Sequence, residues 1–221
     1  ELGLADLAQI EKRRERLKKQ MRTSKEAQQE DAALERIQAV LEDAGAARSI
    51  ELSEEEALMI KPLGLLTAKP IIYATNVSEE DLAEGNAYCT EVSNLAANEG
   101  AETVRISAQV EAELIELGDD ERTDYLEGLG VSEGGLQSLI QATYRLLGLR
   151  TYFTTGEKET RAWTFKAGMT APQAAGVIHT DFERGFIRAQ TIGWETLIEA
   201  GSFTEARNKG WLRSEGKEYV V

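Results

Sequence analysis

The sequence KPIIYATN at residues 69–76 is the strongest indication of the fold, because it reads as a buried parallel β-strand. It is apolar, rich in β-branched and aromatic residues, and bounded by Pro70. A second strand-like run, ETVRISA, follows at residues 102–108, and a helical segment from about Asn86 to Asn98, ending at Gly100, lies between them. This order predicts part of a parallel α/β sheet. Further helices are predicted around 109–117, 120–129 and 133–147, and we expect residues 63–149 to form half of a domain.

Upstream of this block, residues 1–62 predict an antiparallel helical hairpin. Apolar residues on one face of a first helix, from about residue 4 to 21, are Leu7, Ile10, Leu17 and Met21. After a short polar turn, a second helix repeats apolar residues at coiled-coil spacing and stops at Gly45, a favourable residue just beyond a helix end. A capping box at Ser53 and Glu56 then predicts a short helix over residues 53–60.

The first helix carries a basic stripe. Between residues 12 and 25 the sequence has eight basic residues and a single acidic one, Glu15. The members that we consider candidates for contact with a partner are Lys12, Arg13, Arg16 and Lys19. The alternative is that this charge run is only the solvated face of a coiled-coil arm.

From residue 150 to residue 221 the pattern changes to that of a small α+β domain. Strand-like runs at 152–155 and 160–165 flank Gly156 and predict a hairpin, and a capping box at Thr170 and Gln173 opens a short helix. A strand over 185–192, short helices at 194–199 and 203–209, and the start of a strand at 218–221 follow. This is the order of a β-grasp, or ubiquitin-like, module, and we expect its last strand to be missing from this chain.

Polar segments follow both strands of the predicted parallel sheet. They are Asn76, Val77, Ser78 and Glu79 after the first strand, and Ser107, Ala108 and Gln109 after the second. Purine-nucleotide G domains read the base with Asn-Lys-x-Asp and Ser-Ala-x loops at such positions, where an asparagine amide and backbone amides face the base edge. Here Val77 replaces the lysine and Glu79 replaces the aspartate, which weakens a guanine-specific site and admits adenine.

A simpler interpretation of the first loop remains open. Residues 76–81 are also an ordinary helix N-terminus, in which Ser78 and Asp81 make a capping box. The occurrence of both loops in one sequence favours nucleotide recognition.

Composition excludes several classes of protein. With 42% hydrophobic and 29% charged residues the chain is too apolar for disorder, and no apolar run approaches the length of a membrane span. One cysteine and one histidine exclude a disulfide framework and a histidine-clustered zinc site. The net charge of −14 is uneven, since residues 67–149 hold 4 basic and 16 acidic residues. No targeting segment is visible, so we expect a cytoplasmic protein without a membrane partner.

Long stretches of the chain closely resemble the YchF family of Obg-like ATPases. The stretches are 69–77, 152–154, 161–164, 171–189 and 215–221, of which APQAAGVIHTDFERGFIRA at 171–189 is the most specific. The resemblance implies a translation-factor-class P-loop NTPase with a helical arm inserted in its G domain, followed by a TGS domain of β-grasp fold. It also implies preference for ATP over GTP and association with the ribosome and its RNA, without specificity for a DNA sequence.

The resemblance carries roles onto particular residues. It implies that Asn76 and the Val77 backbone face the adenine, with Glu79 in the altered motif, and that Ser107, Ala108 and Gln109 form the other wall. It also supports RNA or ribosome contact by Lys12, Arg13, Arg16 and Lys19 of the arm and by three cations of the C-terminal module, Lys166, Arg184 and Arg188.

One family motif is absent from these 221 residues. No Gly-x-x-x-x-Gly-Lys-Ser/Thr occurs, and the only Gly-Lys pair, Gly216-Lys217, precedes a glutamate. We therefore expect no catalytic residue and no metal ligand in this chain, and expect Mg²⁺ to bind with ATP through a missing N-terminal half. By itself this piece is expected not to hydrolyse ATP. The alternative function is a non-enzymatic adaptor, in which the arm and the TGS module bind RNA or protein.

Other residues that invite a functional interpretation have simpler ones. His179 is expected to be a helix-terminal residue and Cys89 a packing residue, with catalysis and redox chemistry as the respective alternatives. The tryptophans Trp163, Trp194 and Trp211 are expected in the core, although they could stack on RNA.

Overall fold

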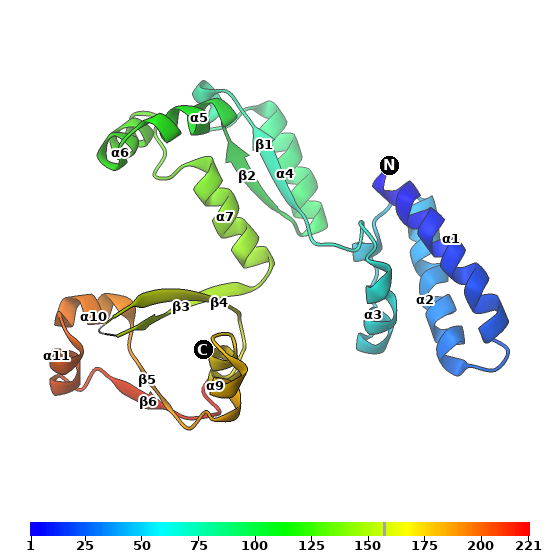
Figure 1. Ribbon diagram of the computed structural model, residues 1–221. Coiled ribbons are helices and arrows are strands. Elements are labelled where there is room, and N and C mark those ends of the chain that lie inside the picture. Colours follow the sequence, from blue (N-terminus) through cyan, green and yellow to red (C-terminus); the bar gives the residue numbers. More distant parts are fainter. Residues whose placement is uncertain (157) are drawn as a thin grey trace. The chain divides into compact units, whose positions relative to one another are not determined.

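The computed structural model describes residues 1–156 and 158–221 and divides into two compact units, Glu1–Leu136 and Gln137–Val221 (Figure 1). The sequence suggested three domains, 1–62, 63–149 and 150–221. That division stays a prediction, because the structure separates into two units and the boundary between them falls within helix α7 (Gly135–Leu146).

The first unit begins with the predicted hairpin of α1 (Leu2–Gln20) and α2 (Lys25–Glu42). The apolar stripes of the two helices meet and bury a core that includes Ile10, Leu17, Leu34, Ile37 and Leu41. At the tip, Ser24 caps α2 by accepting a hydrogen bond from the Ala27 N–H at 3.2 Å. The structure therefore confirms the helical hairpin that the apolar spacing predicts.

The end of α2 differs in detail from the expectation. Ala44, not Gly45, adopts the left-handed conformation, with φ 58°. The Gly45 N–H donates to Val40 O at 2.8 Å and the Ala44 N–H to Leu41 O at 3.2 Å, which together form a Schellman motif. Gly45 is required for another reason, since a Cβ there would lie 2.5 Å from Val40 Cγ1.

A connecting segment returns the chain to the α/β block through η1 (Ala47–Ser49), α3 (Glu54–Ile60) and η2 (Lys61–Leu63). The capping box of Ser53 and Glu56 is present, as predicted. The Asp6 carboxylate of α1 is 1% exposed and accepts hydrogen bonds from the Leu66 N–H, the Thr67 N–H and the Thr67 hydroxyl. This carboxylate holds the start of the hairpin against the segment that leads into β1.

The α/β block contains the predicted parallel pair, β1 (Ile72–Asn76) and β2 (Glu102–Ile106), joined through η3 (Glu79–Asp81) and α4 (Ala87–Glu99). Helix α4 packs on both strands, and Figure 1 shows it alongside them. It begins at the cap Asn86 and ends at Gly100 in the left-handed conformation, as expected. Strand β1 is not buried, because Ala74 and Asn76 are exposed. The prediction of a buried strand was wrong for this chain, because β1 and β2 form a sheet of only two strands.

Two further helices follow β2 in the chain. They are α5 (Ala108–Glu116), capped by Ser107, and α6 (Asp119–Gly128). Their apolar residues form a small core around the buried Leu82, Val110 and Leu114, and the side chain of Val77 packs against it. This core supports the loops at the ends of β1 and β2.

The second unit contains the predicted hairpin, β3 (Leu149–Thr155) and β4 (Thr160–Lys166), followed by α8 (Ala171–Gly176) with its capping box. Next come α9 (Thr180–Arg184), β5 (Ala189–Thr191), α10 (Trp194–Ala200), α11 (Phe203–Asn208) and β6 (Arg213–Glu215). Four elements differ from the prediction: α9 and β6 were not expected, β5 is shorter than 185–192, and residues 218–221 make only an isolated bridge between Val220 and Thr170. Strand β5 pairs with β6 in a sheet of their own, so the β-grasp assignment stays a prediction.

Within the part of the chain that the structure describes, no helix has both the length and the apolar character to cross a membrane.

Candidate functional site

The structure brings the two predicted base-reading loops together. Strands β1 and β2 are parallel and in register, so that Asn76 lies opposite Ile106 and the two strands end side by side. The Val77 N–H continues the ladder by donating to Ile106 O at 2.8 Å. Between the two loops, the Asn76 side-chain oxygen accepts a hydrogen bond from the Ala108 N–H at 3.0 Å. One side chain thus ties the first loop to the N-terminus of α5.

The candidate residues differ in what they present to solvent. Asn76, Glu79, Ala108 and Gln109 are exposed, whereas Ser107 is 1% exposed and its hydroxyl accepts from the Val110 N–H at 3.5 Å. Among the described residues no partner is seen for the Asn76 Nδ2 group. The surface therefore offers the Asn76 amide as a donor, while the Ser107 hydroxyl serves as a helix cap.

A polar network beside the loops includes two residues that the sequence did not suggest. Gln109 Nε2 donates to Glu113 Oε1 at 3.1 Å, and the Tyr125 hydroxyl donates to Glu113 Oε2 at 2.5 Å. These bonds lower the pKa of Glu113, and the bond to Glu113 raises the pKa of Tyr125 to about 12, with a smaller contribution from the charge of Glu79. The four-residue spacing on one helix indicates the Gln109–Glu113 contact. Tyr125 comes from another helix and has no local signal.

The loop that carries Glu79 is held by short polar contacts. The Ser78 hydroxyl donates to Asp81 Oδ2 at 3.2 Å, and Asn86 Nδ2 donates to the same oxygen at 2.8 Å. Ser78 precedes a single 3₁₀ turn and makes no side-chain bond to the backbone there, while Asn86 is the cap of α4. The capping interpretation was therefore right in taking Ser78 as the residue that begins a helical turn, and wrong in expecting a capping box there.

The basic stripe of α1 divides into paired and unpaired cations. The Arg13 guanidinium makes two hydrogen bonds to the Glu30 carboxylate, at 2.6 and 2.7 Å, and Arg14 is bound in the same way by Asp31. The bond to Glu30 raises the pKa of Arg13. Arg13 thus links α1 to α2, a structural role that the stripe interpretation missed. Lys12, Arg16 and Lys19 are exposed, and no ion pair is seen for them among the described residues.

In the second unit Lys166, Arg184 and Arg188 are all exposed. His179 caps α9 by accepting from the Asp181 N–H at 3.2 Å, which confirms its helix-terminal role. The tryptophan expectation was wrong: Trp194 is 59% exposed, and the other two are partly buried with Arg161 and Lys209 stacked over their rings.

Cys89 is buried within α4, as expected of a packing residue. Residues 1–156 and 158–221 contain no group of three or more His, Cys, Asp or Glu side chains placed to hold a metal ion.

Comparisons with known proteins find similarity along the whole chain. The family YchF-GTPase_C, described as "Protein of unknown function (DUF933)", matches residues 149–221. Two relatives named "Ribosome-binding ATPase YchF", from Bacillus subtilis (strain 168) and Escherichia coli O157:H7, are each 48% identical, over 224 and 222 residues. The solved structure of the Schizosaccharomyces pombe YchF GTPase superposes with a TM-score of 0.84 at 34% identity. Each relative is matched by 100% of this chain, which spans 61% of that relative's length.

Proposed function

The chain belongs to the YchF family, and we propose that it carries the base-recognition loops and the ribosome-contacting surfaces of a P-loop ATPase. The relatives are named as ribosome-binding ATPases and as a GTPase, so nucleotide and ribosome are the partners to be tested. In this proposal residues 63–149 are the C-terminal half of a G domain, residues 1–62 are its inserted arm, and residues 150–221 are a TGS domain.

The hydrogen bond between Asn76 and Ala108 is the observation that carries the nucleotide assignment. It places an amide donor, Asn76 Nδ2, at the carboxyl ends of two parallel strands, where α/β proteins bind their ligands. A purine N7 is an acceptor for such a donor.

The same geometry supports a preference for ATP over GTP. The Ala108 N–H is taken by Asn76 and the Val77 N–H by Ile106 O, so neither is available to donate to the O6 acceptor of guanine. Adenine carries an amino group at that position and has no need of a donor there. Glu79, longer than the aspartate of guanine-reading loops, lies exposed beside them.

Phosphate binding and hydrolysis are assigned to residues outside this chain. ATPases of this class hold Mg²⁺ with the nucleotide phosphates, and the ion supplies neutralisation of the charge that develops during transfer. The described residues show no cluster of ligands that fits a metal.

Ribosome contact is assigned to exposed cations of both units. This contact would take place in the cytoplasm. In the first unit they are Lys12, Arg16 and Lys19, and in the second they are Lys166, Arg184 and Arg188. Backbone contacts to RNA need cations and no precise pocket, which suits exposed side chains.

Equilibrium binding of labelled ATP and GTP, with Mg²⁺, to the complete protein and to this 221-residue chain tests the proposal. We expect the complete protein to bind ATP more tightly than GTP and the chain alone to bind neither firmly, because it lacks a phosphate loop. Absence of nucleotide binding by the complete protein would overturn the ATPase assignment and favour a non-enzymatic adaptor.

A further inference from the structure

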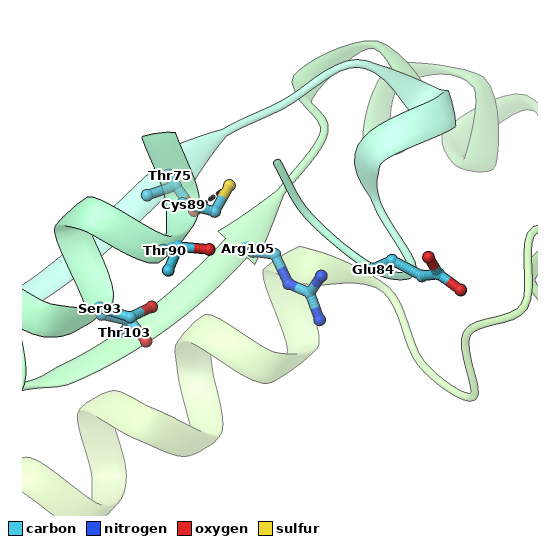
Figure 2. A pocket seen from close by; sticks show the side chains of 7 residues that line it. All are labelled: Thr75, Glu84, Cys89, Thr90, Ser93, Thr103 and Arg105. Atoms are coloured by element: carbon cyan, nitrogen blue, oxygen red, sulfur yellow. Dashed lines mark hydrogen bonds between the residues drawn. The ribbon is translucent and has the colours of Figure 1, made fainter. Parts of the chain in front are cut away.

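A polar trough lies between α4 and β2, apart from the base-reading loops. It has a volume of about 380 Å³ and is lined by Thr75, Glu84, Cys89, Thr90, Ser93, Thr103 and Arg105. Figure 2 shows Thr90 and Ser93 on the helix and Thr103 and Arg105 on the strand, with Glu84 apart from them on a loop. The proposed function gives this trough no role.

Arg105 is the one cation among the residues that line the trough. Its guanidinium lies over Gly85, where a Cβ would come within 3.0 Å of Arg105 Nη1. Among the described residues no acidic partner is seen for it, and in Figure 2 the Glu84 carboxylate is directed away from it. The surrounding residues 67–149 hold 16 acidic and 4 basic side chains, so an arginine without an acidic partner is unexpected there. An arginine without an acidic partner is suited to bind a phosphate through two parallel hydrogen bonds.

Hydroxyl groups continue the trough away from Arg105. Within the described part of the chain, Ser93 and Thr103 show no hydrogen-bond partner. Thr75 and Thr90 donate to the carbonyls of Val104 and Asn86, at 3.4 and 3.3 Å. Thr75 also accepts from Cys89 Sγ at 3.9 Å, and each hydroxyl keeps a lone pair to accept with. Thr103 and Arg105 lie on the same face of β2 two residues apart, a spacing of about 6.6 Å. A ligand that contacts both must carry polar groups at two points.

We propose that this trough binds a small phosphorylated polyol. Its phosphate would be held by the Arg105 guanidinium, and its hydroxyl groups by Ser93 and Thr103. Inorganic phosphate satisfies only the first contact and an uncharged polyol only the second.

The test is a titration of the 221-residue chain with glycerol 3-phosphate, inorganic phosphate and glycerol, followed by NMR of the backbone amides. We expect glycerol 3-phosphate to bind most tightly and to shift amides of residues 75–105. Arg105→Gln should weaken binding by about tenfold or more, since a hydrogen bond to a charged group is lost. Ser93→Ala with Thr103→Val should reduce the affinity for glycerol 3-phosphate to that for inorganic phosphate.

Lys69→Gln is the matched control, because it removes one exposed positive charge of the same block outside the trough. It should leave the affinity unchanged. Equal losses in Lys69→Gln and Arg105→Gln would overturn the proposal in favour of non-specific attraction, and equal wild-type affinity for inorganic phosphate and glycerol 3-phosphate would overturn the polyol assignment. Because Asn76 and Ala108 take no part in this binding, its failure would leave the nucleotide proposal untouched.

Discussion

Asn76 is the residue on which the candidate nucleotide site depends. Its side-chain oxygen is engaged with the backbone of α5, and this engagement orients its Nδ2 group outward. An asparagine in this position both joins two loops and presents a donor. Its replacement should therefore affect ligand binding at the surface.

We predict that Asn76→Ala in the complete protein weakens ATP binding by about 1–3 kcal/mol, because the base loses a hydrogen-bond partner. Isothermal titration calorimetry measures the change. Asn94→Ala, at an exposed position of α4, is the control and should bind as the wild type does. Unchanged affinity in Asn76→Ala would remove this residue from the site.

Asp6 is a second residue with an effect beyond its size. We predict that Asp6→Ala lowers the free energy of unfolding by about 2–4 kcal/mol, because the buried N–H and hydroxyl of Thr67 and the partly buried N–H of Leu66 lose their acceptor. Urea unfolding measures this. Glu11→Ala removes an exposed carboxylate from the same helix and should change little. A loss in Asp6→Ala no larger than in that control would show that the anchor contributes nothing.

At the scale of the element, the end of α2 combines a favourable and an unfavourable residue. The left-handed conformation of Ala44 is unfavourable because its Cβ crowds the backbone. A glycine has no Cβ and adopts this conformation without that cost. Gly45 in turn admits the close approach of Val40. The two positions respond to substitution in opposite directions.

We predict that Ala44→Gly raises the free energy of unfolding by about 0.5–1 kcal/mol, since it relieves that conformation. Gly45→Ala should lower it, because the new Cβ would lie 3.0 Å from Val40 O and closer still to Val40 Cγ1. Thermal and chemical unfolding of both variants measure the pair of effects. A destabilised Ala44→Gly would contradict the Schellman geometry.

At the scale of the whole molecule, the net charge of −14 is distributed unevenly along the chain. Exposed cations gather on α1, while the block at 67–149 is strongly acidic. The pairing of Arg13 with Glu30 removes one cation from the stripe and makes it part of the hairpin. The remaining exposed cations are the ones to alter in a test of ribosome binding.

We predict that changing Lys12, Arg16 and Lys19 together to Glu reduces co-sedimentation of the complete protein with ribosomes. Its salt dependence should fall by roughly one in slope for each phosphate contact removed. Arg13 stays unchanged so that the hairpin is preserved. The same reversal at Lys61, Lys69 and Lys217, three exposed lysines elsewhere, is the control. Equal sedimentation of the two variants would leave the stripe as a solvated face.

The sequence by itself determined the elements whose signals are local. The hairpin follows from apolar residues that recur along each helix, and α3 and α4 begin and end at caps that are neighbours in the chain, such as Ser53 and Gly100. The parallel pair of strands and the β3–β4 hairpin follow from their apolar runs and bounding residues. These features were predictable because each depends on residues a few positions apart.

Only the tertiary structure decided which polar groups pair with which. Asn76 meets Ala108 across 32 positions, Arg13 meets Glu30 across 17 and Tyr125 meets Glu113 across 12. The short pairing of β5 with β6, and the reduction of 218–221 to a bridge, likewise depend on segments distant in the chain. A side chain that makes one of these hydrogen bonds stands in no regular sequence pattern with its distant partner. The geometry of the candidate site therefore depends on the packing that brings the partners together.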